Sequence, residues 1–175
     1  SQDFVVWNTR SGSMPSAGPV SQVNENKYGL EMPLGLSGYF NLDEGLAAAK
    51  ATGKPVFVDI TGHGCVNCRE MEQRVWSDPR VLDILRNEYI LVALYTDDKT
   101  KLPESEWVTA ENGKVLKDMG RINSYVARNR FGVNAQPNYV LLSPDGVQLM
   151  PIRGYNLDVD GFIEFLKSGL AKVAK

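Results

Sequence analysis

The chain carries its only two cysteines in the stretch PVFVDITGHGCVNC, residues 55–68. The first part is an apolar run interrupted by one aspartate, which is typical of a buried strand, and Thr-Gly-His-Gly after it has turn composition. Cys65 and Cys68 therefore stand at the start of a helix that follows a strand. A helix N-terminus offers unpaired N–H groups and a partial positive charge that favour a thiolate. The pattern predicts a reversible dithiol/disulfide pair.

The composition of the 175 residues is that of a globular domain. Hydrophobic residues make up 43%, enough for a core that needs no disulfide staples. A net charge of −2 gives no attraction toward nucleic acid or anionic lipid, so neither is expected as a partner. No stretch approaches the roughly 18 consecutive apolar residues of a membrane span, and no cofactor is expected. Because the chain begins at Ser1 without a signal segment, we expect a processed form or a fragment.

Two regions are expected along the chain. Residues 1–36 are rich in Ser, Gly, Pro and Asn, which predicts an irregular N-terminal extension or linker. Only residues 4–7 and 28–36 of this extension are expected to pack on the core. Residues 37–175 have regular periodicity and form the second region, a single domain.

The domain has an alternating order of elements. The predicted elements are a helix capped by Asn41 and Glu44 and ended by Gly53, a strand at 55–60, a helix from the cysteines to about residue 76, a helix that restarts at Pro79, a strand at 89–95, a helix around 122–130, a hairpin of strands at 138–143 and 147–150, and a last helix from about residue 159. From the first strand the order is β-α-β-α-β-β-α, which predicts a thioredoxin-like α/β fold with a mixed central sheet flanked by helices.

A polar insertion at 96–119 precedes the 122–130 helix. We expect it to be an ordered surface feature, because a structureless loop that long is uncommon in a compact domain. Its expected anchors are Leu102, Trp107, Val108 and Val115.

Two carboxylates and one proline are candidate site residues near the cysteines. Asp59 lies inside the apolar strand, where an ionised carboxylate is costly, so it should have a raised pKa or a partner. Glu72 is four residues after Cys68, which places it on the same helical face as both sulfurs. The Gln136-Pro137 bond directly before a strand is where this fold would place a cis proline facing the disulfide.

Residues 38–175 resemble the C-terminal thioredoxin-like domain of the DsbD family, the transmembrane thiol:disulfide interchange proteins of bacteria. The matching segments are residues 45–54, 57–60, 64–72 and 77–79, with Gln136-Pro137 entering a strand. Cys-Val-x-Cys followed by Lys/Arg-x-x-Glu is more specific than the general thioredoxin motif Cys-Gly-Pro-Cys. One departure is Gly64, with His63 beside it, where the family usually has an aromatic residue before the first cysteine.

The resemblance implies roles for these residues. Cys65 would be the attacking thiol and Cys68 the resolving thiol, with Asp59 and Glu72 tuning both. Our candidate substrate-binding residues around the disulfide are His63, Gly64, Gln136 and Pro137. The resemblance also implies exchange with partner proteins through transient mixed disulfides, a membrane-embedded electron donor, a periplasmic acceptor, and a periplasmic location for this chain.

The stability of the Cys65 thiolate decides the direction of electron flow. The helix terminus favours it by on the order of 0.3–1 kcal/mol. One ionised carboxylate about 6 Å away opposes it by roughly 3 kcal/mol at an effective dielectric constant near 20. If Asp59 or Glu72 is ionised near Cys65, the carboxylate outweighs the helix terminus, and we expect the pair to act as a reductant of protein disulfides.

Other interpretations of these residues stay open at this point. Structural zinc takes four Cys or His ligands, and with its sole histidine, His63, the chain supplies three. A permanent structural disulfide is disfavoured, because closing so short a loop constrains the unfolded chain little. The functional alternative is a non-catalytic binding module whose C-x-x-C pair belongs to a metal site. Glu72 could simply pair with Arg69, and His63 could be a turn residue at the edge of the site.

Overall fold

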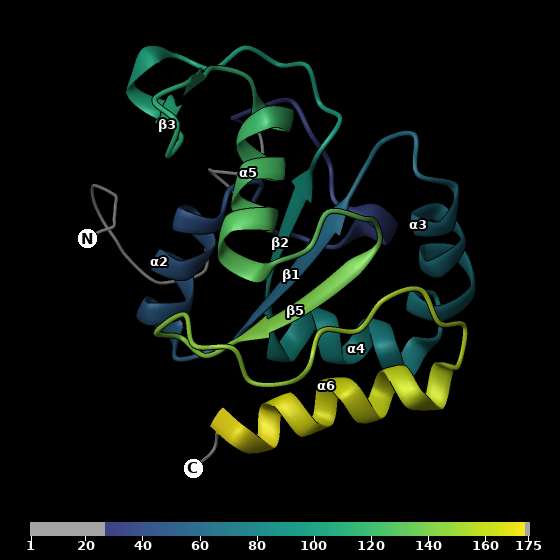
Figure 1. Cartoon of the computed structure of the whole chain (residues 1–175). Coiled ribbons are helices and arrows are strands. Elements are labelled where there is room, and N and C mark those ends of the chain that lie inside the picture. Colours follow the sequence, from purple (N-terminus) through teal and green to yellow (C-terminus); the bar gives the residue numbers. More distant parts are fainter. Residues whose placement is uncertain (1–26, 174–175) are drawn as a thin grey trace.

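The computed structural model describes residues 27–173, and the expectation for residues 4–7 lies outside this range. A central sheet has the strand order β2-β1-β5 (Figure 1). The strands are β1 (Val56–Thr61), β2 (Ile90–Tyr95) and β5 (Asn138–Leu142). β1 pairs parallel with β2 and antiparallel with β5, so the sheet is mixed as expected.

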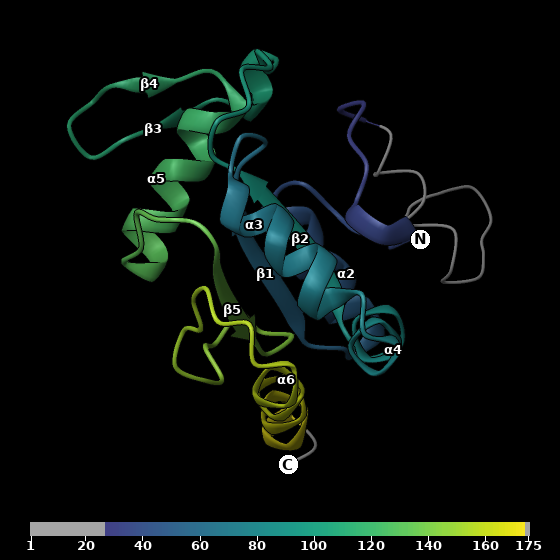
Figure 2. The same ribbon diagram turned by 90° about the vertical axis from the view of Figure 1, so that its right-hand side faces the viewer.

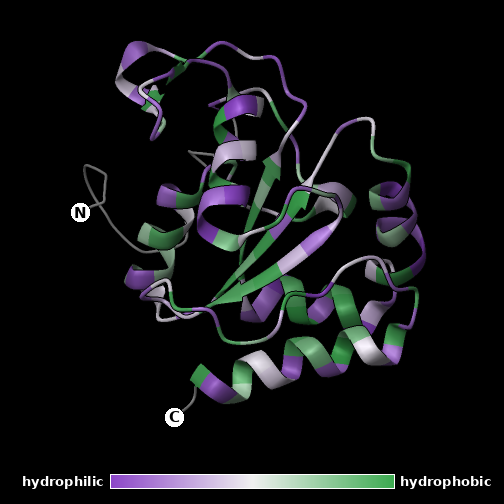
Figure 3. Ribbon diagram, viewed as in Figure 1, coloured by the Kyte–Doolittle hydropathy of each residue, from purple (hydrophilic) through white to green (hydrophobic). Residues whose placement is uncertain are grey.

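Helices cover both faces of the sheet. The side chains of β1 alternate between the two faces, and all of its residues are buried. Phe57 belongs to a core with residues of α4 and α6, whereas Val58 belongs to a second core with residues of α2 and α5. These helices are α2 (Leu42–Thr52), α4 (Pro79–Glu88), α5 (Met119–Phe131) and α6 (Val159–Val173). Figure 3 shows the apolar strands between helices of mixed character. Because Asp59 shares a face with Phe57, it points toward the core on the α4 and α6 side.

The helix caps follow the predicted local chemistry. Asn41 Oδ1 accepts a 2.8 Å hydrogen bond from the Glu44 backbone N–H at the start of α2, and Gly53 ends the helix with a φ of 77°. Asp78 caps α4, with Pro79 in the first helical turn where its missing N–H does no harm. The cysteine helix α3 (Val66–Met71) continues through a π-helical turn (Glu72–Trp76), as far as predicted.

The predicted strand at 147–150 is wrong. The turn before it forms, since the Ser143 N–H donates to the Val147 carbonyl at 2.7 Å. Beyond it, two isolated bridges in place of a strand join β5 to this segment, one between Leu142 and Gln148 and one between Tyr139 and Arg153. The Leu149 N–H donates to the Leu141 carbonyl of β5. Pro151, two residues later, has no N–H with which to extend the ladder of hydrogen bonds.

The insertion is ordered, as predicted, and carries a short hairpin of β3 (Val108–Thr109) and β4 (Val115–Leu116). Figure 2 shows this hairpin projecting beside α5, far from α6. Trp107 anchors it, since its indole N–H donates to the Leu102 carbonyl at 2.9 Å and the Lys117 ammonium lies 4.7 Å from its ring centre. The predicted anchor Val115 is wrong: it is exposed, and its neighbour on the opposite face of the strand, Leu116, is buried.

Helix α5 begins at Met119, earlier than the predicted residue 122, because Asp118 caps it by accepting from the Arg121 N–H. At the other end of the described chain, residues 28–36 pack on the core as expected, with Met32 and Leu36 buried. No helix within residues 27–173 is long and apolar enough to cross a membrane.

Candidate functional site

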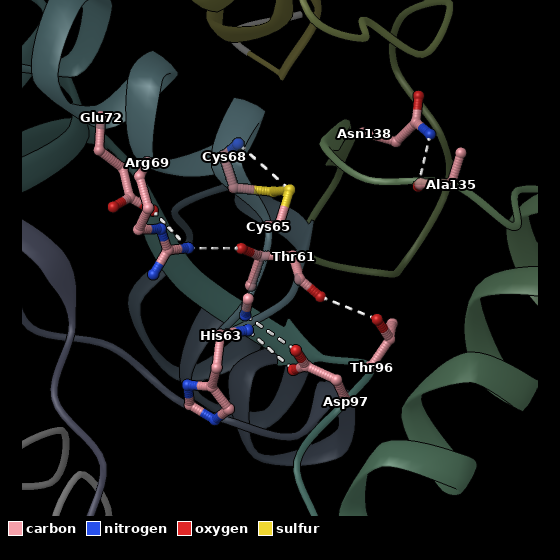
Figure 4. Close-up of a disulfide and its surroundings, with 11 residues drawn as sticks. Thr61, His63, Cys65, Cys68, Arg69, Glu72, Thr96, Asp97, Ala135 and Asn138 are labelled. Atoms are coloured by element: carbon pink, nitrogen blue, oxygen red, sulfur yellow. Dashed lines mark hydrogen bonds and ion pairs between the residues drawn. A yellow bond between two sulfur atoms is a disulfide. The ribbon is translucent and has the colours of Figure 1, made fainter.

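The two cysteines form a disulfide at the start of α3 (Figure 4). Cys65 is the N-cap residue, and its Sγ accepts a 3.2 Å hydrogen bond from the Cys68 N–H. Cys65 is partly exposed, whereas only 1% of Cys68 is exposed. This is the difference in access that a helix-start C-x-x-C predicts: the first sulfur meets a partner and the second is covered.

Asp59 lies beneath this helix in the core and is 2% exposed. Burial raises its pKa well above the ordinary value, and the nearby Glu72 carboxylate adds to the rise, while the Arg69 guanidinium opposes it. Asp59 therefore keeps its proton to a higher pH than an ordinary aspartate does. The structure bears out the raised pKa that the sequence predicts.

Glu72 forms a salt bridge with Arg69, its Oε2 lying 3.1 Å from Nη2. The simpler interpretation of Glu72 as a partner of Arg69 is thus confirmed. Burial raises the pKa of Glu72, and the guanidinium partly offsets the rise. Arg69 Nη2 also donates to Thr61 Oγ1 at 3.0 Å, which ties α3 to the end of β1. With Asp59 shifted toward its neutral form and Glu72 paired, less negative charge faces the sulfurs than expected from the sequence.

The turn before Cys65 is held by Asp97, directly after β2. Asp97 Oδ1 accepts from the His63 N–H at 2.7 Å, and Oδ2 accepts from the Gly64 N–H at 2.9 Å. Burial alone would raise the pKa of Asp97, but these hydrogen bonds outweigh it and the pKa is lowered. A Cβ on Gly62 would lie 3.3 Å from the same carboxylate, a tight contact that favours glycine at this position.

His63 lies at the edge of the site, as expected of a turn residue. Its ring stacks on Tyr95 with centroids 4.0 Å apart, and its Nε2 lies 2.7 Å from Asp98 Oδ2. The Asp98 carboxyl is buried, yet its pKa is lowered because hydrogen bonds from Thr100 and His63 outweigh desolvation.

The Gln136-Pro137 peptide bond is cis, as predicted. Pro137 is buried and Gln136 is half-buried. Figure 4 shows the flanking residues Ala135 and Asn138 among the surroundings of the disulfide, and the Asn138 side chain donates to the Ala135 carbonyl at 2.8 Å. An internal hydrogen bond thus stabilises the loop that carries the cis bond.

The predicted site residues lie on β1, on the turn and helix that follow it, and on the loop before β5, but sequence reasoning missed three contributors: Thr61, Asp97 and Asp98. A signal for the aspartates existed. β1 and β2 are parallel, so the residues that follow both strands meet at one edge of the sheet. Within residues 27–173, no group of three or more His, Cys, Asp and Glu side chains is arranged to hold a metal ion, and the metal-site alternative has no support.

We expect Asp97→Ala to lower the free energy of unfolding by about 1–2 kcal/mol, because two backbone N–H groups lose a charged acceptor that water only partly replaces. Asp97→Asn keeps one acceptor oxygen and should lose less. Urea unfolding of the oxidised protein measures both. The exposed Asp145, changed to alanine, is the matched control and should leave the midpoint in place. A wild-type midpoint for Asp97→Ala would contradict the role of Asp97 in holding this turn.

Comparison with known proteins places this geometry among relatives. A family model described as a thioredoxin-like domain matches residues 42–169. The thiol:disulfide interchange protein DsbD of Ralstonia nicotianae is 42% identical over 57 residues, which cover 33% of this chain and 9% of that protein. DsbD 2 of Pseudomonas aeruginosa is 31% identical over 123 residues, covering 70% of this chain and 17% of that protein. This chain therefore spans less than a fifth of either relative.

The solved structure of a DsbH oxidoreductase superimposes with a TM-score of 0.57 and 17% identity, covering 86% of this chain and 96% of that one. At this identity the likeness concerns the fold alone, and it agrees with the predicted thioredoxin-like class. The resemblance to DsbD proteins that the sequence predicts is confirmed.

Proposed function

We propose that this chain, which belongs to the thioredoxin-like domain family, is a thiol:disulfide oxidoreductase that uses Cys65 and Cys68. The observation that carries the proposal is the disulfide at the start of α3, with a partly exposed first cysteine and a buried second one. That arrangement suits exchange with another protein, because only the first sulfur needs to meet the partner.

In the reducing direction, the Cys65 thiolate attacks one sulfur of a partner disulfide. A Cys65–partner bond forms, and the other partner sulfur leaves as a thiolate that takes up a proton. Cys68 then gives its proton to Asp59 in its ionised form and attacks Cys65 Sγ. The mixed disulfide breaks, the partner leaves with both sulfurs reduced, and Cys65–Cys68 is oxidised. Two electrons have moved to the partner.

We further propose that the pair acts as a reductant. Strong oxidants of this fold stabilise the Cys thiolate with a nearby cation. Here the Arg69 guanidinium is bound to Glu72, and the His63 ring is bound to Asp98. Because each of these groups has a carboxylate partner, neither presents an uncompensated charge to Cys65. The helix terminus is left as the main stabilising factor.

The test is a redox titration of the protein in dithiothreitol or glutathione buffers, with free thiols counted at each potential. We expect a reversible two-electron transition below about −200 mV, nearer the thioredoxin value of about −270 mV than the value of about −120 mV of strongly oxidising members. A midpoint near −120 mV would overturn the reductant proposal. Absence of any reversible transition would overturn the oxidoreductase itself.

The partners we propose are proteins that form transient mixed disulfides with Cys65. The similarity to interchange proteins supports a membrane-embedded donor and a periplasmic acceptor, with this chain acting in the periplasm. Gln136, Pro137, His63 and Gly64 are the proposed contact residues around the disulfide. Trapping with a Cys68→Ala protein, described below, would identify such partners directly.

A further inference from the structure

A groove runs along α5 from the cis peptide bond toward the β3–β4 hairpin. Its wider part is a cavity of about 360 Å³ between α5 and the hairpin, with Lys114 in its lining. Its narrower part is a cavity of about 50 Å³ that reaches Gln136. Thr96, Ser124 and Arg128 line both cavities, so the two are adjoining parts of one feature, here called the α5 groove.

The α5 groove is positively charged. Lys114, Arg121 and Arg128 line it, and all three residues are exposed. Arg121 Nε lies 3.6 Å from Asp118 Oδ2, whereas Lys114 and Arg128 form no ion pair within residues 27–173. None of the described residues that line either cavity is acidic. In a chain whose net charge is −2, this is a local concentration of cations that favours an anionic partner.

One end of the groove is fixed to the strand that precedes the disulfide. Thr96 donates to the Thr61 carbonyl through both its N–H and its Oγ1, each at 3.0 Å, so its position is fixed to the end of β1. Figure 4 shows Thr61 and Thr96 together next to the turn that leads to Cys65. At the same end, Gln136 is joined by the cis bond to Pro137. This end of the groove is therefore attached to β1, the strand that leads into the turn before Cys65, and to the loop that carries the cis bond.

We propose that the α5 groove binds an acidic segment of the partner protein, next to the disulfide that Cys65 attacks. The proposal rests on the proposed oxidoreductase function and adds to it a source of partner selection. The carboxylates of the segment pair with Arg128 and Lys114. The polar side chains of Thr96, Ser124 and Gln136 provide hydrogen-bonding groups for its backbone. Charges at the rim of an interface act mainly on the rate of encounter and on partner choice.

The test uses synthetic peptides that contain one disulfide and are flanked by four aspartates, four serines or four lysines. The reduced protein is mixed with each, and kcat/KM for disulfide reduction is measured. We expect the aspartate peptide to exceed the serine peptide by about fivefold at low salt, mainly through KM, with the lysine peptide slowest. The preference should disappear at high salt, because the interacting charges are exposed to solvent.

Arg128→Gln and Arg128→Glu should reduce the aspartate-to-serine ratio in that order, and adding Lys114→Glu should bring it to about one or below. Arg86→Glu is the matched control. It makes the same charge change at an exposed position on α4, which lies across the sheet from α5 (Figure 1), and the ratio should stay at the wild-type value.

Equal rates for the three peptides in the wild-type protein would overturn the proposal, as would an Arg86→Glu protein that loses the preference as fully as Arg128→Glu. Binding of inorganic phosphate without any peptide preference would also overturn it, and would assign the groove to a small anion. Failure of the protein to reduce even the serine peptide would instead overturn the oxidoreductase function, so the two failures are distinguishable.

Discussion

A Cys65→Ala protein should have no measurable disulfide reductase activity, a loss of about a thousandfold or more. Cys65 carries the sulfur that can be reached from solvent, and the buried Cys68 cannot replace it in the first attack. Turnover of a peptide disulfide, followed by the appearance of free thiols, measures this loss. The exposed Val147, changed to alanine, is the control and should keep the wild-type rate.

Cys68→Ala should also stop turnover, but at a later step. The first exchange still occurs, and the mixed disulfide persists because no second thiol is available to break it. Non-reducing electrophoresis should show a covalent adduct for Cys68→Ala and none for Cys65→Ala. In the reduced wild-type protein, limiting iodoacetamide should label Cys65 first. Equal labelling of the two thiols, or adducts from both variants, would contradict these assignments.

The parts of the site that follow from local sequence periodicity could be predicted. Burial of Asp59 follows from its place in an apolar run, and the shared face of Glu72 and the cysteines follows from helical spacing. Both depend on residues close together in the chain. The cis bond before Pro137 is predicted in another way, from its place in the order of elements of the whole fold.

The parts that depend on contacts between distant segments could not be predicted in the same way. The hydrogen bonds from the turn at His63 and Gly64 to Asp97 join residues more than thirty positions apart. Their formation requires that β1 and β2 lie parallel and end at the same edge. The α5 groove depends likewise on where an insertion folds back, which periodicity does not specify. The predicted strand at 147–150 failed because alternation of side chains does not take account of the missing N–H of Pro151.

Asp59→Asn should increase the stability of the oxidised protein at neutral and alkaline pH. Burial, reinforced by Glu72, raises the pKa of Asp59 in the folded state above the unfolded value of about 3.9. A group whose folded pKa is raised contributes its full stability below the unfolded pKa and loses it as the pH rises through the folded pKa. Asparagine stays neutral and loses nothing. The stability difference should therefore be small near pH 4 and should grow with pH.

The size of this difference follows from linkage, at about 1.4 kcal/mol for each unit by which the pKa is raised. Urea unfolding at a series of pH values measures it, and the disulfide form is used so that no thiol titrates. Asp145→Asn, at an exposed carboxylate, is the control and should follow the wild type throughout. Parallel curves for Asp59→Asn and wild type over the whole range would show that folding does not raise the pKa of Asp59.

The same substitution should slow the reaction while making Cys65 easier to ionise. Removing a carboxyl group that can become charged lowers the pKa of the Cys65 thiol, which is seen as faster alkylation of the reduced protein at pH values where Asp59 is ionised in the wild type. Turnover should nevertheless fall by roughly a hundredfold, because Cys68 loses the proton acceptor it needs to resolve the mixed disulfide. Glu72→Gln should shift the pKa of Cys65 in the same direction by less, since Glu72 is already paired with Arg69. An unchanged or higher Cys65 pKa in Asp59→Asn would disprove the tuning role, and unchanged turnover would remove Asp59 from the resolving step.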